Sequence, residues 1–116
     1  MIPATLNINI YQGDDYELTF RMKDGDTNTY VNLTGMTGRA QIRASKDATA
    51  VLSTFTVAIL DQTVAPGGVY ITLTPAQTAA IPLSGGVWDV ELRNTGATWV
   101  RTPLAGAVSV VAEVTR

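Results

Sequence analysis

Acidic side chains are the only groups in this sequence whose types and spacing could support catalysis. Asp89 and Glu91 are two residues apart, and Asp14, Asp15 and Glu17 cluster where an alternating segment begins. Glycosidases use such carboxyl pairs, but they also need a cleft that a small β-domain rarely offers. The chain has no histidine and no cysteine, which excludes Ser–His, Cys–His and histidine–metal sites. We therefore expect solvated carboxylates on outer strand faces, and predict no catalytic residue and no enzyme.

The loop DGDTNT is a second candidate, because its acidic and amide side chains could bind calcium. Asp24, Asp26 and Asn28 occupy the first, third and fifth positions of an EF-hand-like pattern. The sixth position is Thr29 rather than Gly, and the twelfth is Gly35 rather than Glu. Hairpin turns require the same residue types, and neither GxxxxGK[ST] nor GxGxxG occurs. We predict a hairpin here, with no metal site and no cofactor.

The composition sets limits on the partners of this chain. Its 116 residues suggest one domain spanning residues 1–116. The net charge is −2 and the eight basic residues are scattered, so we expect no nucleic-acid partner. No run of about 18 apolar residues is present, which argues against a membrane span. The start MIPATLNINI lacks the basic region and long apolar core of a signal peptide.

Alternating apolar and polar residues dominate the chain, as is typical of half-buried β-strands. This alternation points Leu6, Ile8 and Ile10 inward, and it does the same for Ala44, Val51, Val108, Val110 and Val114. The expected strand segments are residues 5–11, 15–23, 38–45, 51–59, 69–73, 86–94, 97–104 and 105–116, and residues 30–33 should pair back briefly after the hairpin at residues 24–29.

One segment breaks the alternation with helix-start signals. Thr74 is a suitable N-cap, Pro75 suits the first helical position, and Gln77 sits where a capping box needs it. Pro82 should end the helix. We predict an all-β, antiparallel, immunoglobulin-like β-sandwich of seven to nine strands with one short helical turn near residues 75–81. A small closed barrel is the alternative.

Aromatic residues divide between the two faces of these expected strands. Those that point inward are best read as core, namely Tyr16, Phe20, Phe55 and Trp88. Tyr11, Tyr70 and Trp99 are outward or ambiguous. Outward rings can bind a sugar or a partner protein, or simply cover cross-strand neighbours.

Several short motifs then follow one another in a recognisable order. They are Q-G-D, D-G-D, V-N-L-T-G and A-Q-I-R within residues 11–43, and I-T-L-T-P-A-Q-T-A-A-I-P-L-S-G-G-V-W-D-V-E-L further on. Their order resembles small Ig-like domains of tailed-phage virion proteins, including the N-terminal domain of phage baseplate upper proteins. Ile81 and Trp88 stand where that family more commonly has Leu and Tyr. The resemblance runs from about Ile10 to the C-terminus.

The resemblance implies a non-enzymatic structural component of a phage virion, made in the host cytoplasm and assembled with other virion proteins in many copies. A tail, baseplate or fibre-attachment position is expected. A capsid decoration protein and a module that binds host glycans on the particle surface are the alternatives.

The two ends of the chain are the expected assembly surfaces. Segments 6–11 and 108–115 carry one charged residue between them, Glu113. Uncharged edge strands are poorly defended against pairing with another chain, so we expect homo-oligomeric contacts there. The candidate interface residues are Leu6, Ile8, Tyr11, Tyr70, Trp99 and Val111.

Overall fold

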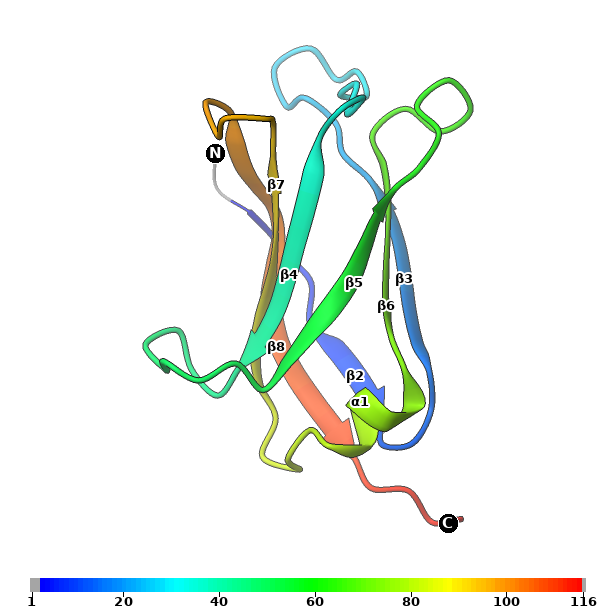
Figure 1. The fold of residues 1–116 in the computed structure, drawn as a ribbon, viewed down its shortest axis with the longest axis vertical. Coiled ribbons are helices and arrows are strands. Elements are labelled where there is room, and N and C mark those ends of the chain that lie inside the picture. Colours follow the sequence, from blue (N-terminus) through cyan, green and yellow to red (C-terminus); the bar gives the residue numbers. More distant parts are fainter. Residues whose placement is uncertain (1–2, 116) are drawn as a thin grey trace.

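Eight strands and one short helix form the part of the chain that the computed structural model describes, residues 3–115 (Figure 1). This confirms the predicted all-β fold. Residues 1, 2 and 116 of the expected domain lie outside the described residues. The elements are β1 (Ala4–Thr5), β2 (Ile8–Tyr11), β3 (Tyr16–Arg21), β4 (Thr37–Arg43), β5 (Ser53–Ile59), β6 (Gly68–Leu73), α1 (Pro75–Ala79), β7 (Gly86–Arg93) and β8 (Val100–Val111).

The strands form one continuous sheet that bends at β5 into two layers. Their order is β1-β8-β7-β4-β5-β6-β3, and β2 also pairs with β8. The first part of β5 pairs with β4, where Phe55 lies opposite Ala40. The second part pairs with β6, where Val57 lies opposite Ile71. The two edges of this bent sheet are therefore β3 on one layer and β1 with β2 on the other.

The expectation of a purely antiparallel sheet is wrong at the N-terminus. Both β1 and β2 run parallel to β8, with Ile8 opposite Val108 and Tyr11 opposite Val111. Parallel neighbours need a long connection, and here nearly the whole domain separates the two segments. The first and last strands can therefore lie side by side in the same direction.

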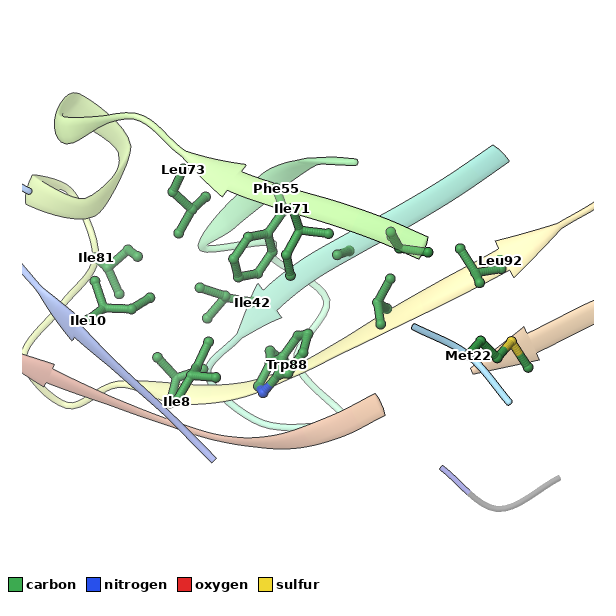
Figure 2. Close-up of a cluster of buried hydrophobic side chains, with 14 of the residues drawn as sticks. Ile8, Ile10, Met22, Ile42, Phe55, Ile71, Leu73, Ile81, Trp88 and Leu92 are labelled. Carbon is green, nitrogen blue, oxygen red and sulfur yellow. The ribbon is translucent and has the colours of Figure 1, made fainter. Parts of the chain in front are cut away.

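The core lies between the two layers and runs from Ile81 and Leu73 at the end that carries α1 to Leu92 and Met22 at the other end (Figure 2). Figure 2 shows Ile8 and Ile10 pointing from β2 toward the cluster that contains Ile42 and Trp88. Phe55 links the layers, since its ring centroid lies 6.2 Å from that of Tyr16 and 5.9 Å from that of Trp88. Phe55 and Trp88 are buried as predicted. Tyr16 and Phe20 are only partly buried and pack against the core.

The helix α1 begins as its sequence predicts. Thr74 Oγ1 accepts the Gln77 backbone N–H at 3.2 Å, and Gln77 Oε1 accepts the Thr74 N–H at 2.8 Å. Pro75 occupies the first turn, and the chain then leads from β6 in one layer to β7 in the other. Ile81 follows the helix and is fully buried, so this segment closes one end of the core.

Three residues predicted to point inward lie at the surface, because their strands are shorter than the alternation suggested. Strand β4 ends at Arg43, and Ala44 is exposed in the following bend. Strand β5 begins only at Ser53, which leaves Val51 39% exposed. Val114 lies beyond the end of β8 and is 83% exposed. Alternation alone continues past the last residue that has a pairing partner.

Strand β8 is one long strand rather than the two segments expected. Its register against β7 shifts between the pairs Val90–Leu104 and Leu92–Arg101, so β8 carries one extra residue there. Pro103 lies within this irregularity. Proline has no backbone N–H, and here the regular hydrogen bonding between β7 and β8 is already interrupted, so the missing donor costs no strand-pairing bond. The shift lets the strand pass a proline without ending.

Candidate functional site

A cleft of about 910 Å³ lies on the outer face of β4, β7 and β8. Its charged lining residues are Arg43, Lys46, Asp89 and Arg101. Arg43 is held in place, since its guanidinium donates to the Ala48 carbonyl at 2.8 Å and also to the Thr49 carbonyl and the Gln41 side chain. Three cations around one carboxylate give this cleft a positive charge in a chain whose net charge is −2.

Asp89 is the one acidic residue that lines the cleft. It lies opposite Gln41 on β4 and Ala105 on β8, so both cross-strand neighbours are uncharged. Burial is the main cause that raises the pKa of Asp89, and the nearby Glu91 charge adds to it, while Arg43 and Lys46 oppose the shift. The carboxylate is therefore partly desolvated but still faces two cations.

Glu91, the other member of the predicted carboxyl pair, forms ion pairs with two arginines. Its Oε1 accepts a hydrogen bond from Arg39 at 3.1 Å and a shorter one from Arg93. The Arg93 hydrogen bond lowers the pKa of Glu91; partial burial opposes this, and Arg39 adds to the lowering.

The two carboxyls are not placed as in glycosidases, where both acids flank one cleft. Residues two apart on a strand are separated by about 6–7 Å, which by itself would fall in the range that glycosidases use. However, Asp89 lines the cleft and Glu91 does not, so no cleft separates them across a substrate position. The occupied Glu91 makes a structural ion pair.

The second acidic cluster lies at the far side of the molecule, around the turn that leads into β3. Asp14, Asp15 and Glu17 are all exposed. Glu17 hydrogen-bonds the Tyr70 hydroxyl on the neighbouring strand β6. Burial is the main cause that raises the pKa of Tyr70. The hydrogen bond to Glu17 and the negative charges of Glu17 and Asp15 raise it further. The cluster is an outer strand face, as the sequence predicted.

The loop considered for calcium is a hairpin that its own side chains hold together. The Asp24 carboxylate accepts the Asp26 N–H at 2.8 Å and lies 3.4 Å from the Thr27 nitrogen. Lys23 and Tyr30 close the loop with an isolated bridge. Among residues 3–115, no cluster of three or more acidic, histidine or cysteine side chains could hold a metal ion.

The predicted interface residues do not form one surface. Leu6 is half-buried, and its carbonyl accepts the Trp88 indole N–H at 2.8 Å. Ile8 is 4% exposed, so its side chain belongs to the core and cannot contact a partner. Tyr11 and Val111 are 41% and 49% exposed and lie opposite each other on β2 and β8. These two do form a common exposed patch.

Tyr70 and Trp99 lie apart from that patch and from each other. Tyr70 is on β6 in the layer that ends at β3, while Trp99 precedes β8 in the other layer. Trp99 is half-buried beneath Arg101, whose guanidinium carbon lies 5.1 Å from the ring centroid. The two rings therefore make no shared platform for a sugar.

The C-terminal segment is not the open edge that its sequence suggested. Strand β8 pairs with β7 on one side and with β1 and β2 on the other. Its low charge reflects an interior strand of the sheet. Strand β2 pairs only with β8 among the described residues, so the predicted uncharged edge is real at β2.

Sequence reasoning missed the basic lining of the cleft and the role of Thr78. The alternation places Arg43 outward, but only the register with β7 and β8 brings it to Asp89 and Arg101. Thr78 is fully buried, and its hydroxyl binds the β2–β3 turn through the Gly13 N–H at 3.1 Å. No local pattern marks either feature.

Comparisons with known proteins bear on the fold and the family. A search of curated proteins gives no match. Among solved structures, 188 chains match, so the fold alone cannot select a function. One is described as "Parallel homodimer structures of the extracellular domains of the voltage-gated sodium channel beta4 subunit explain its role in cell-cell adhesion". It aligns over 98% of this chain and 97% of that chain, with a TM-score of 0.51 and 11% identity.

At that identity, the likeness shows the fold alone, and it agrees with the immunoglobulin-like sandwich predicted from the sequence. The one helix in residues 3–115, α1, has five residues and is far too short to cross a membrane. The family model for the "LtfC-like, beta-sandwich domain" matches residues 2–110. The chain therefore belongs to the LtfC-like β-sandwich family.

Proposed function

We propose that this protein is a non-enzymatic structural component of a tailed-phage virion that acts in multiple copies. The order of its sequence motifs, which resembles that of Ig-like phage virion domains, supports a phage-associated role, and the family match is consistent with it. The single observation that carries the assembly role is the open edge of β2, which has no charged residue and presents the exposed Tyr11.

The arrangement of the acidic residues supports a non-enzymatic role. Glu91 is bound by two arginines, and the Asp24 carboxylate holds its own loop. Asp89 lines the cleft without a second acidic residue in the lining. If the protein were instead a glycosidase, purified protein would turn over glycans, and Asp89→Asn or Glu91→Gln would abolish that turnover.

A position at the tail, the baseplate or a fibre attachment point is the proposed location, with other virion proteins as neighbours. Quantitative mass spectrometry of purified particles, combined with particle reconstruction, tests this. We expect the protein in purified virions at a copy number that fits a ring at the tail. Density on the capsid surface would favour a decoration protein. Absence from virions of a protein that is also strictly monomeric would refute the proposal.

The basic cleft favours a second candidate function, the binding of an acidic glycan on the particle surface. Arg43, Lys46 and Arg101 line a hollow of about 910 Å³, and charge complementarity selects anionic over neutral ligands. A glycan array should then show binding to acidic glycans that Arg101→Ala weakens without loss of folding. Binding lost in Trp99→Ala would implicate the ring beside Arg101, and an array without any signal would exclude this function.

A further inference from the structure

The backbone of β2 presents alternate residues to its outer edge. The Leu6 and Gln12 backbone N–H groups both donate to β8 carbonyls, each at 2.9 Å. Since backbone groups of a strand point to alternate sides, the even-numbered residues between them also face β8. The N–H and C=O groups of Asn7 and Asn9, and the N–H of Tyr11, therefore point away from the sheet.

Neighbouring segments limit this open stretch at its C-terminal end. The Tyr11 carbonyl accepts the Asp14 N–H of the following turn at 3.2 Å. The Gly13 N–H, which is the next one to point outward, is bound to Thr78 of α1. No described strand pairs with this side of β2. The available groups are thus the donors and acceptors of Asn7 and Asn9 and the donor of Tyr11.

The opposite edge of the sheet differs in charge. Strand β3 carries Glu17 and Arg21 on its exposed positions, and Lys23 follows it. Charged side chains on an edge strand discourage pairing with another chain. Strand β2 has only Asn9 and Tyr11 on its outer face, and the next strand places Ser109 and Val111 beside them. An edge without charge is one that an identical copy can approach without repulsion.

We propose that a second copy of this chain pairs with β2 in antiparallel orientation about a two-fold axis at Asn9. This inference rests on the proposed function in multiple copies and names the contact. In this register the two Asn9 residues exchange two backbone hydrogen bonds. Each Tyr11 N–H then reaches the Asn7 carbonyl of the other copy. The register pairs the Asn9 and Tyr11 donors, and the Asn7 N–H faces the Tyr11 carbonyl of the other copy, which already accepts the Asp14 N–H.

The exposed side chains beside the edge extend this contact. Tyr11 and Val111 form an apolar patch next to the axis, and exposed aromatic rings are favoured anchors of protein interfaces. A four-residue strand pair buries far less than the roughly 1,200 Å² of a stable complex. Self-association of the isolated protein should therefore be weak and reversible, and repetition around a particle would add up many such contacts.

Disulfide trapping can detect a weak contact and also reads its register. The chain has no cysteine, so one introduced thiol reports on one position. Paired Asn9 residues would have Cα atoms about 5.5 Å apart, within the range of about 4.4–6.8 Å that a disulfide needs. The two Tyr11 positions would be offset by four residues, or about 13 Å. Thr19→Cys on the middle of β3 is the matched control.

We expect the Asn9→Cys protein to form covalent dimers at least about tenfold faster than Thr19→Cys, because pairing raises the local thiol concentration. Tyr11→Cys should behave like the control. Equal rates for Asn9→Cys and Thr19→Cys, or faster dimers of Tyr11→Cys, would overturn the inference. Circular dichroism and thermal unfolding confirm that each variant is folded before its rate is compared.

A charge placed on the axis gives an independent readout. Asn9→Lys brings two like charges together at the axis. Sedimentation at high protein concentration should therefore show that Asn9→Lys no longer self-associates, whereas Thr19→Lys should self-associate like the unmodified protein. Detection of the protein in purified virions without Asn9→Cys dimers would refute this contact and leave the proposed function standing. Asn9→Cys dimers of a protein absent from virions would support the contact and refute the virion role.

Discussion

The two edge strands of the bent sheet are held and protected in opposite ways. In β2, both inward-facing residues are buried, with Ile8 at 4% and Ile10 at 0% exposure. In β3, the inward-facing residues Tyr16, Leu18 and Phe20 are all only half-buried. Strand β3 carries charges on its outer face and β2 carries none. A firmly anchored neutral edge can pair with another chain without unfolding, while a loosely anchored edge needs charges to stay unpaired.

The largest effect should come from truncating the anchor of the neutral edge. Ile10→Ala removes a fully buried side chain, which typically lowers the free energy of unfolding by about 2–5 kcal/mol. Leu18→Ala on β3 should lower it by clearly less, because Leu18 is already partly exposed. Urea denaturation of both variants measures the difference. Equal losses would show that the two edges are anchored alike.

The sequence was sufficient to predict the features that local chemistry controls. The alternation around Ile42 and Trp88 depends only on neighbouring residues, and so does the capping box of Thr74 and Gln77. These predictions are confirmed. The ends of strands were less accurate, because Val114 continues an apolar pattern without a strand to pack against.

Features that depend on the pairing of distant segments could not be predicted. The parallel contact of Ile8 with Val108 joins residues 100 positions apart, and nothing in either segment specifies its direction. The same register buries Ile8. The sequence had suggested Ile8 as an interface residue, because it lies in a segment without charged residues. The cleft likewise depends on Arg43, Asp89 and Arg101 from three strands. The position of a residue along one strand predicts which face of the sheet its side chain lies on. Which residues of different strands meet in a site depends on the register between the strands, and the sequence does not show that register.

Loss of the hydroxyl that joins the two edges should have the next largest effect. Thr78 Oγ1 accepts the Gly13 N–H and lies 2.7 Å from the Asp14 carbonyl, in the turn between β2 and β3. Thr78→Val keeps the shape but leaves these groups without this partner, which should lower the free energy of unfolding by about 1–3 kcal/mol. Hydrogen exchange of the Gly13 amide should accelerate.

The exposed Thr19→Val on β3 is the matched control, since surface substitutions usually change stability by less than about 0.5 kcal/mol. An unchanged Gly13 exchange rate in Thr78→Val would contradict the idea that α1 holds the turn between the edges.

A smaller effect is expected from the charged side chains of the β3 edge. The Arg21 guanidinium carbon lies 3.6 Å from the Tyr30 ring centroid, and its Nε donates to the Pro66 carbonyl at 3.1 Å. Arg21→Ala should lower the free energy of unfolding by about 0.5–1 kcal/mol, as for an exposed cation–π contact. It should also make the protein more prone to aggregate on heating, as light scattering would show. Unchanged aggregation would mean that charge does not protect this edge.

The smallest effect concerns charged residues on the central strands β4 and β7. These residues form ion pairs with one another rather than protecting a sheet edge from another chain. Glu91→Gln weakens the ion pairs with Arg39 and Arg93, which are partly exposed at 61% and 33%. Such pairs contribute about 0.2–1 kcal/mol, so the variant should lose about that much stability at pH 7. Asp89→Asn should lose none, because burial opposes ionisation of that carboxyl.

The dependence on pH separates these two variants by sign. Arg93 and Arg39 hold the pKa of Glu91 below its ordinary value, which it keeps in the unfolded chain. Its contribution is therefore present above that value and is lost as the pH falls through the folded pKa. The stability gap between the unmodified protein and Glu91→Gln should close in acid. For Asp89 the pKa is raised, so ionisation is unfavourable in the folded state. The advantage of Asp89→Asn should therefore be absent in acid, grow as the pH rises above the ordinary pKa of an aspartate, and be complete above the raised pKa. Urea denaturation at pH 3 and pH 7 measures both trends, and a Glu91→Gln gap that widened in acid would show that the arginines do not stabilise the ionised carboxylate.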